Sequence, residues 1–358
     1  MESPFASNNP FIVAEIGKNF IQSEEDKSVD EYISNAIKLI DAAKEAGADA
    51  VKFQTHEVED EQLNIDVTSP HFKGSDRYTW VKRNTEATPI EFWQKVKSHC
   101  DNLNMIFFST PMSRKAAIKL EQFDVPFWKV GSGDVQDYVM LNELIRTKKP
   151  IIISTGMVSL SELDEAVGYL SSNGVKLGIL YCVSLYPCPH EQFNLATIEM
   201  LEEKYPNATI GFSDHSIGHD AVFAALKMGA KIIEKHFSLS RDLWGSDHKV
   251  SMTPDEMQRM VNAIRLGEYQ EFDHSPFLGS KEKELEGANN PFRPFFNKKL
   301  IAGKNLSGGQ ILQEDAVFAM RPAKEIEGFE ANRLNDILGK TIAKNLNKYD
   351  AIASDSII

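Results

Sequence analysis

Cysteine is scarce in this chain. Its 358 residues include only three cysteines, Cys100, Cys182 and Cys188. Three thiols are too few for a disulfide framework, so we expect reduced cysteines and a cytoplasmic location. The first residues, MESPFASNNPF, also lack the basic segment followed by an apolar run that marks a secretory signal.

Basic residues and long apolar runs are also in short supply. The chain has 39 Lys and Arg against 52 Asp and Glu, which gives a net charge of −13. Because an acidic chain repels polyanions, we expect no nucleic-acid partner, although a few focused cations can still bind a small anion. No apolar run approaches the roughly 20 residues that cross a bilayer, so we expect no membrane partner.

What the sequence does contain is a repeated alternation of short apolar runs and amphipathic segments. Runs that are apolar throughout are typical of parallel strands covered on both faces. Eight such units within residues 1–280 predict an α/β fold, a (β/α)8 TIM barrel, with a doubly wound sheet as the alternative. The eight runs comprise residues 11–17, 50–55, 105–111, 127–133, 150–156, 177–184, 209–215 and 231–238.

The alternation of apolar runs and amphipathic segments ends around residue 270, and we place the end of the barrel at residue 280. Residues 281–296 are charged and then rich in Asn, Pro and Phe, which favours a linker or an irregular docking segment. Residues 297–358 contain strand-like runs at 298–303, 316–320 and 340–346, which predict a small β-rich domain. The core of so small a domain is marginal, so we expect it to dock on another surface.

Polar residues gather at the carboxyl ends of the predicted strands. In a barrel these ends converge on the face that carries the active site. His215 and His236 end the last two strands, so their imidazoles can share a metal such as Mn, Fe, Co or Zn. The alternative is that each histidine is a hydrogen-bonded residue of the rim.

Lys52 and Lys129 interrupt apolar strands, and a buried lysine needs a counter-charge or an anion. With hydroxyl groups at the strand ends, the two lysines can form a cradle for phosphate or carboxylate. The alternatives are salt bridges to Glu15, Asp134 or Glu234, and a lysine that forms a Schiff base. Glu15 and Asp134 can act as acid or base, or simply balance the lysines.

An ordered series of short motifs resembles the sialic acid (N-acetylneuraminate) synthase family of nonulosonic acid synthases. The barrel region contains AEIGKN, DAVKFQ, FSTP, KVGSGD, ISTGM, CVSLYP, GFSDHSIG, EKHFSLSR and GSDHKVS. The segments KKLIAGKNLSGGQIL, AMRP and LGKTIAKNL resemble the family's C-terminal antifreeze-like (SAF) domain. The resemblance implies a synthase barrel at 1–280, a linker at 281–296 and an antifreeze-like domain at 297–358. It also implies a domain-swapped homodimer, in which this domain caps the partner's site.

The resemblance further implies an activity. The enzyme would condense phosphoenolpyruvate with an N-acetylated hexosamine to give a nine-carbon sialic or nonulosonic acid and inorganic phosphate. The sugar would be N-acetylmannosamine, its 6-phosphate or a 2,4-diacetamido-6-deoxyhexose. His215 and His236 would hold a divalent metal, usually Mn²⁺, with Mg²⁺ or Co²⁺ as alternatives.

The resemblance also assigns the remaining site residues. Glu15, Asp134, Lys52 and Lys129 would be catalytic. The residues around the two substrates would be Gln54, Thr110, Ser132, Ser154, Ser184, Tyr186, Ser213, Asp247 and, from the other subunit, Arg321.

Three positions depart from the family's usual pattern. Phe20 stands where a histidine usually follows AEIGKN, Asp134 where many members have Glu, and Ser184 where several have Asn. These departures leave the sugar open. The competing interpretations are a Schiff-base pyruvate aldolase that uses Lys129, a carbohydrate-binding protein without activity, and a relative that makes another keto-sugar acid.

Overall fold

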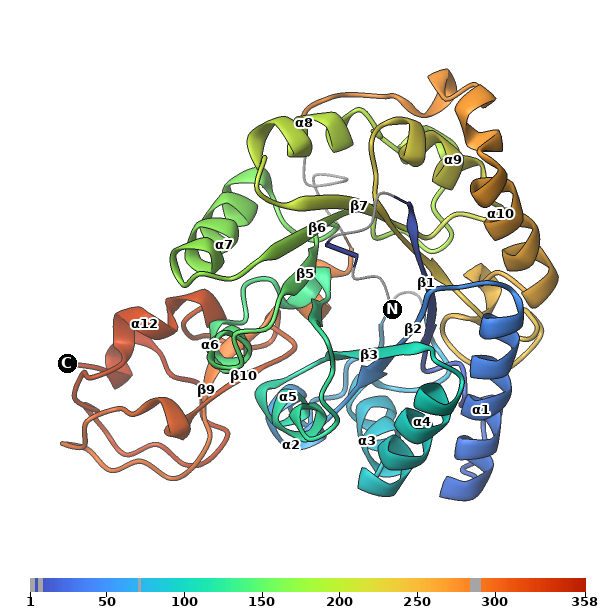
Figure 1. The fold of residues 1–358 in the computed structure, drawn as a ribbon. Helices are drawn as coiled ribbons and strands as arrows, with labels where there is room; N and C mark the ends of the chain where they lie inside the picture. Colours follow the sequence, from blue (N-terminus) through green and yellow to red (C-terminus); the bar gives the residue numbers. More distant parts are fainter. Residues whose placement is uncertain (1–3, 6–8, 70–71, 284–290) are drawn as a thin grey trace.

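The computed structural model describes residues 4–5, 9–69, 72–283 and 291–358. Eight parallel strands form one sheet in the order β3-β2-β1-β8-β7-β6-β5-β4, and β3 and β4 lie side by side to close the ring (Figure 1). The predicted (β/α)8 barrel is therefore confirmed. The strands are β1 (Phe11–Gly17), β2 (Ala50–Thr55), β3 (Ile106–Pro111), β4 (Trp128–Val130), β5 (Ile151–Ser154), β6 (Leu177–Cys182), β7 (Thr209–Asp214) and β8 (Ile232–His236).

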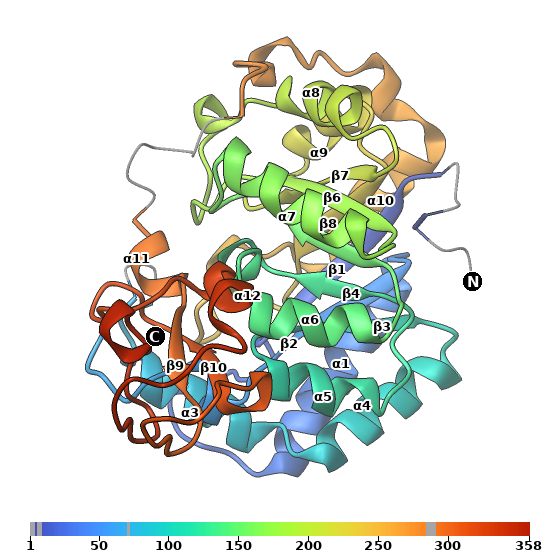
Figure 2. The same ribbon diagram turned by 90° about the vertical axis from the view of Figure 1, so that its left-hand side faces the viewer.

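Helices cover the outside of the ring, as Figures 1 and 2 show from two directions. The longest, α1, buries Ala36, Leu39, Ile40 and Ala43 against the barrel, the spacing of one face of a helix. No helix in the described ranges combines the length and the apolar character that a bilayer crossing requires. The barrel helices are α1 (Val29–Glu45), α2 (Val58–Glu61), α3 (Arg77–Ala87), α4 (Ile90–Asn102), α5 (Arg114–Glu121), α6 (Tyr138–Arg146), α7 (Leu160–Ser172), α8 (Thr197–Lys204), α9 (Asp220–Lys227) and α10 (Pro254–Leu266).

The C-terminal region holds a two-stranded antiparallel sheet of β9 (Lys299–Ala302) and β10 (Val317–Met320). The third strand-like run, 340–346, was expected to be a strand and makes only isolated bridges, such as Ile342 with Ile357. A bend at Lys344 separates the bridges of Thr341 and Ile342 from that of Leu346, so no continuous ladder forms. One short helix, α12 (Leu334–Ile337), completes this region.

This small C-terminal region packs on the barrel of the same chain. Strand β10 contacts α2 and α6, and both views show the red segment against that side of the barrel (Figures 1 and 2). Residues 284–290 of the expected linker lie outside the described residues. Residues 293–296 of that segment form a helical turn, α11 (Arg293–Phe296), which reaches the barrel mouth.

Candidate active site

A cavity of about 120 Å³ lies at the carboxyl ends of the barrel strands. Every predicted site residue lines it except Ser184 and Arg321. The predicted residues that do line it are Glu15, Lys52, Gln54, Thr110, Lys129, Ser132, Asp134, Ser154, Tyr186, Ser213, His215, His236 and Asp247.

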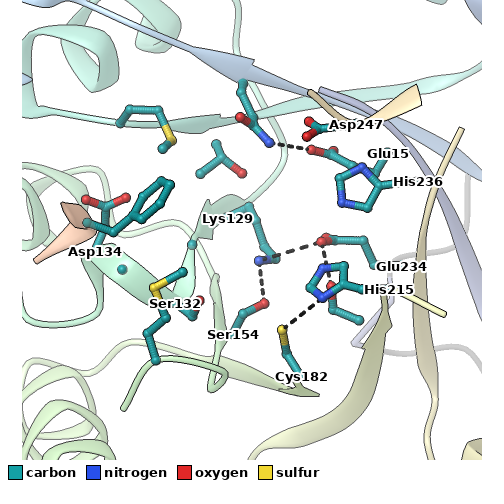
Figure 3. A pocket seen from close by; sticks show the side chains of 18 of the residues that line it. Glu15, Lys129, Ser132, Asp134, Ser154, Cys182, His215, Glu234, His236 and Asp247 are labelled. Carbon is teal, nitrogen blue, oxygen red and sulfur yellow. Dashed lines mark hydrogen bonds and ion pairs between the residues drawn. The ribbon is translucent and has the colours of Figure 1, made fainter. Parts of the chain in front are cut away.

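Strand register brings the two buried lysines to one region of this cavity. Glu15 and Lys52 are paired across β1 and β2, and Lys52 Nζ lies 2.7 Å from Glu15 Oε2. Lys52 Nζ is also 3.6 Å from Glu234 Oε1, and Lys129 Nζ is 3.9 Å from the same oxygen. Lys129 donates to Ser154 Oγ at 2.6 Å (Figure 3). The lysines thus form salt bridges with Glu15 and Glu234, one of the alternatives given above, while facing a shared space.

Glu234 links the two lysines, although from the sequence it was expected only as a salt-bridge partner. Ser213, its register partner on β7, donates to Glu234 Oε1 at 3.0 Å. Side chains alternate along a strand, so Glu234 and His236 face the barrel interior together. Lys235 points the other way and lies 2.5 Å from Asp214, both fully buried. This alternation is the sequence signal that identifies Glu234 as a site residue.

Glu15 and Asp134 lie in opposite electrostatic environments. Burial raises the pKa of Glu15 to about 7, and the Glu234 charge adds to the rise, although Lys52 opposes it. Burial acts on Asp134 in the same sense, but two cations more than offset it and hold its pKa below the usual range. One of these cations is Lys298, whose Nζ lies 2.9 Å from Asp134 Oδ1.

Arg321 is the second cation on Asp134. Within this one chain it is fully buried and forms an ion pair with Asp134. Its expected reach to the sugar from a partner subunit stays a prediction. The backbone explains this placement. Arg321 N donates to Glu61 O at 2.9 Å and Leu63 N donates to Arg321 O at 2.9 Å, which fixes the side chain behind the cavity wall.

The two predicted metal ligands, His215 and His236, lie close together. In Figure 3 Lys129 lies between them and Asp134. The ring centroids of His215 and His236 are 5.4 Å apart. Burial lowers the pKa of both, that of His236 to about 3, so both rings are neutral at neutral pH. His215 Nδ1 donates to Val183 O at 2.8 Å, which leaves its Nε2 lone pair available.

This donor set fits a metal ion. Neutral imidazoles are common metal ligands, and the Val183 carbonyl fixes the tautomer of His215 as partners of metal-bound histidines do. His236 Nδ1 is buried without a hydrogen-bond partner among the described residues. Within those residues no third His, Cys, Asp or Glu completes a ligand cluster. Two ligands leave open positions, as a catalytic site requires.

Two predicted sugar contacts lie at the rim. The ring of Tyr186 packs on His215 at 4.2 Å between centroids. Asp247 Oδ2 lies 3.6 Å from Lys18 Nζ, and Lys18 donates to Gln54 Oε1 at 2.8 Å. Gln54 in turn donates to Glu15 at 2.9 Å, so the rim is hydrogen-bonded to the interior.

Ser184 and Phe20 lie outside the cavity. Ser184 is fully buried, with its Oγ 3.4 Å from Ser132 Oγ, so it supports the wall. Phe20 is fully buried and packs on Phe92 at 4.9 Å between ring centroids. The departure at position 20 therefore belongs to the core, and Lys18 is the residue of that loop that faces the cavity.

Several residues that line the cavity were not predicted from the sequence. They come from the first loop, from the end of β2, from the start of α3 and from the expected linker. Lys18 and His56 follow directly on predicted strands, which is a usable signal, whereas nothing local marks the others. These residues are Lys18, His56, Arg77, Phe292 and Phe296.

The fold and site define a class: a (β/α)8-barrel enzyme with a lysine-lined polar cavity at the carboxyl ends of its strands. The model of the NeuB family matches residues 39–271. A pseudaminic acid synthase from Campylobacter jejuni is 32% identical over 349 residues, covering 96% of this chain and 95% of that protein. An N-acetylneuraminate-9-phosphate synthase from Drosophila melanogaster is 30% identical over 369 residues, 97% and 96% of the two chains.

The solved structures agree with these relatives. The crystal structure of the spore coat polysaccharide biosynthesis protein SpsE from Bacillus subtilis matches with a TM-score of 0.80 and 30% identity, over 98% of this chain and 95% of that one. The chain belongs to the NeuB family. It is an enzyme, a nonulosonic acid synthase.

Proposed function

We propose that this enzyme condenses phosphoenolpyruvate with an N-acetylated hexosamine to give a nine-carbon nonulosonic acid and inorganic phosphate. The observation that carries the proposal is the pair of buried lysines, Lys52 and Lys129, facing one space with hydroxyl donors beside them. A phosphate and a carboxylate on a three-carbon substrate need such cations in a site with little water. The synthase names of the relatives support the same substrates.

The reaction forms a carbon–carbon bond and replaces the phosphate oxygen on C2 by an oxygen of water. C3 of phosphoenolpyruvate attacks the aldehyde carbon of the open-chain sugar, and the aldehyde oxygen takes up a proton. Water adds to C2, and the C2–O bond to phosphate then breaks, which leaves a keto acid and inorganic phosphate. Of the two protons of this water, one balances the proton on the former aldehyde oxygen and the other leaves on the phosphate. The chain's main contribution is to hold the two reactants in place, which is worth roughly 7–11 kcal/mol at best.

Glu15 is the group that moves the proton. Its pKa of about 7 lets it exist in both forms at neutral pH, which suits general acid–base catalysis. Asp134 stays ionised because Arg321 and Lys298 stabilise its charge, so it accepts hydrogen bonds and orients the sugar. The two carboxyl groups therefore have separate roles.

We assign a divalent metal, Mn²⁺ first with Mg²⁺ or Co²⁺ as alternatives, to His215 and His236. Such an ion supplies Lewis-acid polarisation of a carbonyl oxygen. The chain keeps both imidazoles neutral by burial and orients His215 through the carbonyl of Val183.

Dimerisation and location complete the proposal. An antifreeze-like domain at 297–358 would dock on a second copy through the surface that β10 uses here, so that a homodimer exchanges its small domains. The three cysteines are buried and none of them forms a disulfide, which is consistent with a cytoplasmic enzyme.

The test supplies phosphoenolpyruvate, Mn²⁺ and a panel of hexosamines, and measures phosphate release and product mass. Release is expected only when both substrates are present. Lys129→Met should abolish it, whereas Lys340→Met, at an exposed position, should not. Absence of phosphate release with every hexosamine contradicts the proposal.

A Schiff-base aldolase is the second candidate, because burial lowers the pKa of Lys129 and so favours its neutral, nucleophilic form. Borohydride treatment with pyruvate distinguishes the two candidates. Only the aldolase gives a stable pyruvate adduct on Lys129, detected by peptide mass.

A further inference from the structure

Arg77 is a buried cation in the cavity that neither the lysine site nor the metal site uses. It begins α3, and its side chain lines the cavity while the residue is only 5% exposed. Its Nε and Nη2 have no hydrogen-bond partner among the described residues. Burying a cation whose N–H donors have no hydrogen-bond partner costs free energy, unless a bound anion accepts from those donors.

The surroundings of Arg77 leave these donors open. The ring of Phe296 lies over the guanidinium, 4.5 Å from the centroid, and covers one of its faces. The N–H groups of a guanidinium lie in its plane, so a ring on the face does not bind them. Arg321, the other buried arginine nearby, has Asp134 and Glu61 as ion-pair partners.

His56 provides a complementary polar group. Its Nδ1 lies 2.8 Å from Glu61 Oε2, and its Nε2 is buried without a hydrogen-bond partner among the described residues. Burial lowers the pKa of His56, and the charges of Lys18 and Arg77 lower it further, so these groups lie near one another. A neutral ring that donates from Nδ1 to Glu61 offers an acceptor at Nε2.

The two residues lie toward the mouth from the lysine site. Lys52, Gln54 and His56 follow one another along and just beyond β2, and all three line the cavity. At about 3.3 Å per residue, His56 is roughly 13 Å of chain beyond Lys52. The lysines therefore mark the inner part of the cavity lining and His56 its outer part, and Arg77 lies near His56.

We propose that Arg77 and His56 form an outer subsite that binds an anionic group, phosphate or carboxylate, at the end of the sugar remote from its aldehyde. Arg77 donates to the anion, and His56 accepts a hydrogen bond from a neighbouring hydroxyl. This inference rests on the proposed function, because it names the class of the second substrate: an acidic hexosamine, such as a hexosamine 6-phosphate.

The test measures binding, which does not require turnover. Calorimetry compares N-acetylmannosamine 6-phosphate with N-acetylmannosamine on the full chain. We expect the wild type to bind the phosphate ester about tenfold or more tightly, the scale of one charge-assisted hydrogen bond. Arg77→Met should reduce the ratio to about one. Arg77→Lys keeps the positive charge but lacks the paired N–H donors of the guanidinium, so it should retain an intermediate ratio of the two affinities.

Arg83 provides the matched control. It lies on the same helix, pairs with Asp26 at 2.6 Å and does not line the cavity, so Arg83→Met should keep the wild-type ratio. A third ligand, N-acetylmannosaminuronate, carries a carboxylate in place of the phosphate. Whichever of the two acidic sugars binds more tightly shows whether the subsite prefers phosphate or carboxylate.

The inference is overturned if the wild type shows no preference for either acidic sugar, or if Arg77→Met keeps it. If Arg77→Met does not fold, a wild-type ratio in Arg77→Lys overturns it. Failure of the proposed function is a different result: binding then keeps its dependence on Arg77, while no acidic or neutral hexosamine releases phosphate from phosphoenolpyruvate.

Discussion

Neighbouring charges decide what each carboxyl group of the site can do. Glu15 has one ammonium, Lys52, at 2.7 Å and a second carboxylate, Glu234, close to that ammonium. Asp134 has two cations of its own, Lys298 and Arg321. Full burial penalises both charges, but only Asp134 is compensated enough to remain strongly acidic.

Glu15→Gln should lower kcat by about 10²–10⁴-fold, the usual contribution of a general acid or base. In the wild type, the protonated fraction of Glu15 falls as pH rises through about 7, so a donor role predicts a fall in kcat over that range. The variant should lose this limb of the pH profile, while Glu15→Asp should keep a weakened one. Wild-type kcat in Glu15→Gln would rule out the role.

His236→Ala should lose bound metal and metal-dependent turnover without unfolding, because it removes one of two neutral imidazoles that face each other. Metal content after dialysis against Mn²⁺, measured by mass spectrometry of the elements, checks the first effect. Phosphate release and circular dichroism check the others. His190→Ala, at an exposed position, should bind metal as the wild type does. Full activity of His236→Ala in metal-free buffer contradicts the assignment.

Sequence alone predicts residues such as Lys52 and His236, because a polar side chain near the carboxyl end of an apolar barrel strand lies at the face that carries the active site. It does not predict the contacts of Arg321, which depend on how β10 pairs with the segment after α2. The position of Arg77 in the cavity is not predictable for a related reason. Arg77 lies in a helix inserted between β2 and α4, outside the regular alternation of strands and helices.

At the scale of elements, the strand positions were predictable and the irregular segments were not. Each predicted run contains its strand, but β4 covers only Trp128–Val130 of the run 127–133, because the chain turns there into a 3₁₀ helix at Ser132–Asp134. The segment before β9 was expected to be a linker or an irregular docking segment. Its described part places Phe292 and Phe296 in the cavity wall, which its sequence did not predict.

The packing between β6, β7 and β8 leaves no room for a side chain at Gly211. A Cβ there would lie 2.4 Å from Ile232 O and 2.6 Å from Leu180 Cδ2. Gly211→Ala should therefore lower the free energy of unfolding by about 1–3 kcal/mol, as overpacked cores do. Urea unfolding measures the change.

Gly168 is the control for that prediction. It lies within α7, and a Cβ there meets nothing within 4 Å. Gly168→Ala should raise the free energy of unfolding by about 0.5–1 kcal/mol, because alanine loses less backbone entropy in a helix. Equal effects of the two substitutions would show that close packing around Gly211 is not the cause.

At the scale of the whole molecule, the contact between Asp134 and Arg321 tests domain exchange. Asp134→Asn and Arg321→Gln should each inactivate the enzyme, because each removes the ion pair between these residues and leaves the remaining buried charge with one partner fewer. In an exchanged dimer, a mixture of the two variants assembles one barrel with both native residues. We expect co-refolding of the two variants to restore part of the activity. If none returns, each small domain stays on its own barrel.

The balance of charge inside the barrel has a consequence for how a substrate enters. Lys52 and Lys129 face Glu15 and Glu234, so the resting interior is close to neutral, and a multiply charged anion upsets that balance. The least costly response is for Glu15, which titrates near 7, to take a hydrogen ion from the solvent. Substrate entry then couples to the buffer, and the heat of association should change with the buffer's own ionisation enthalpy.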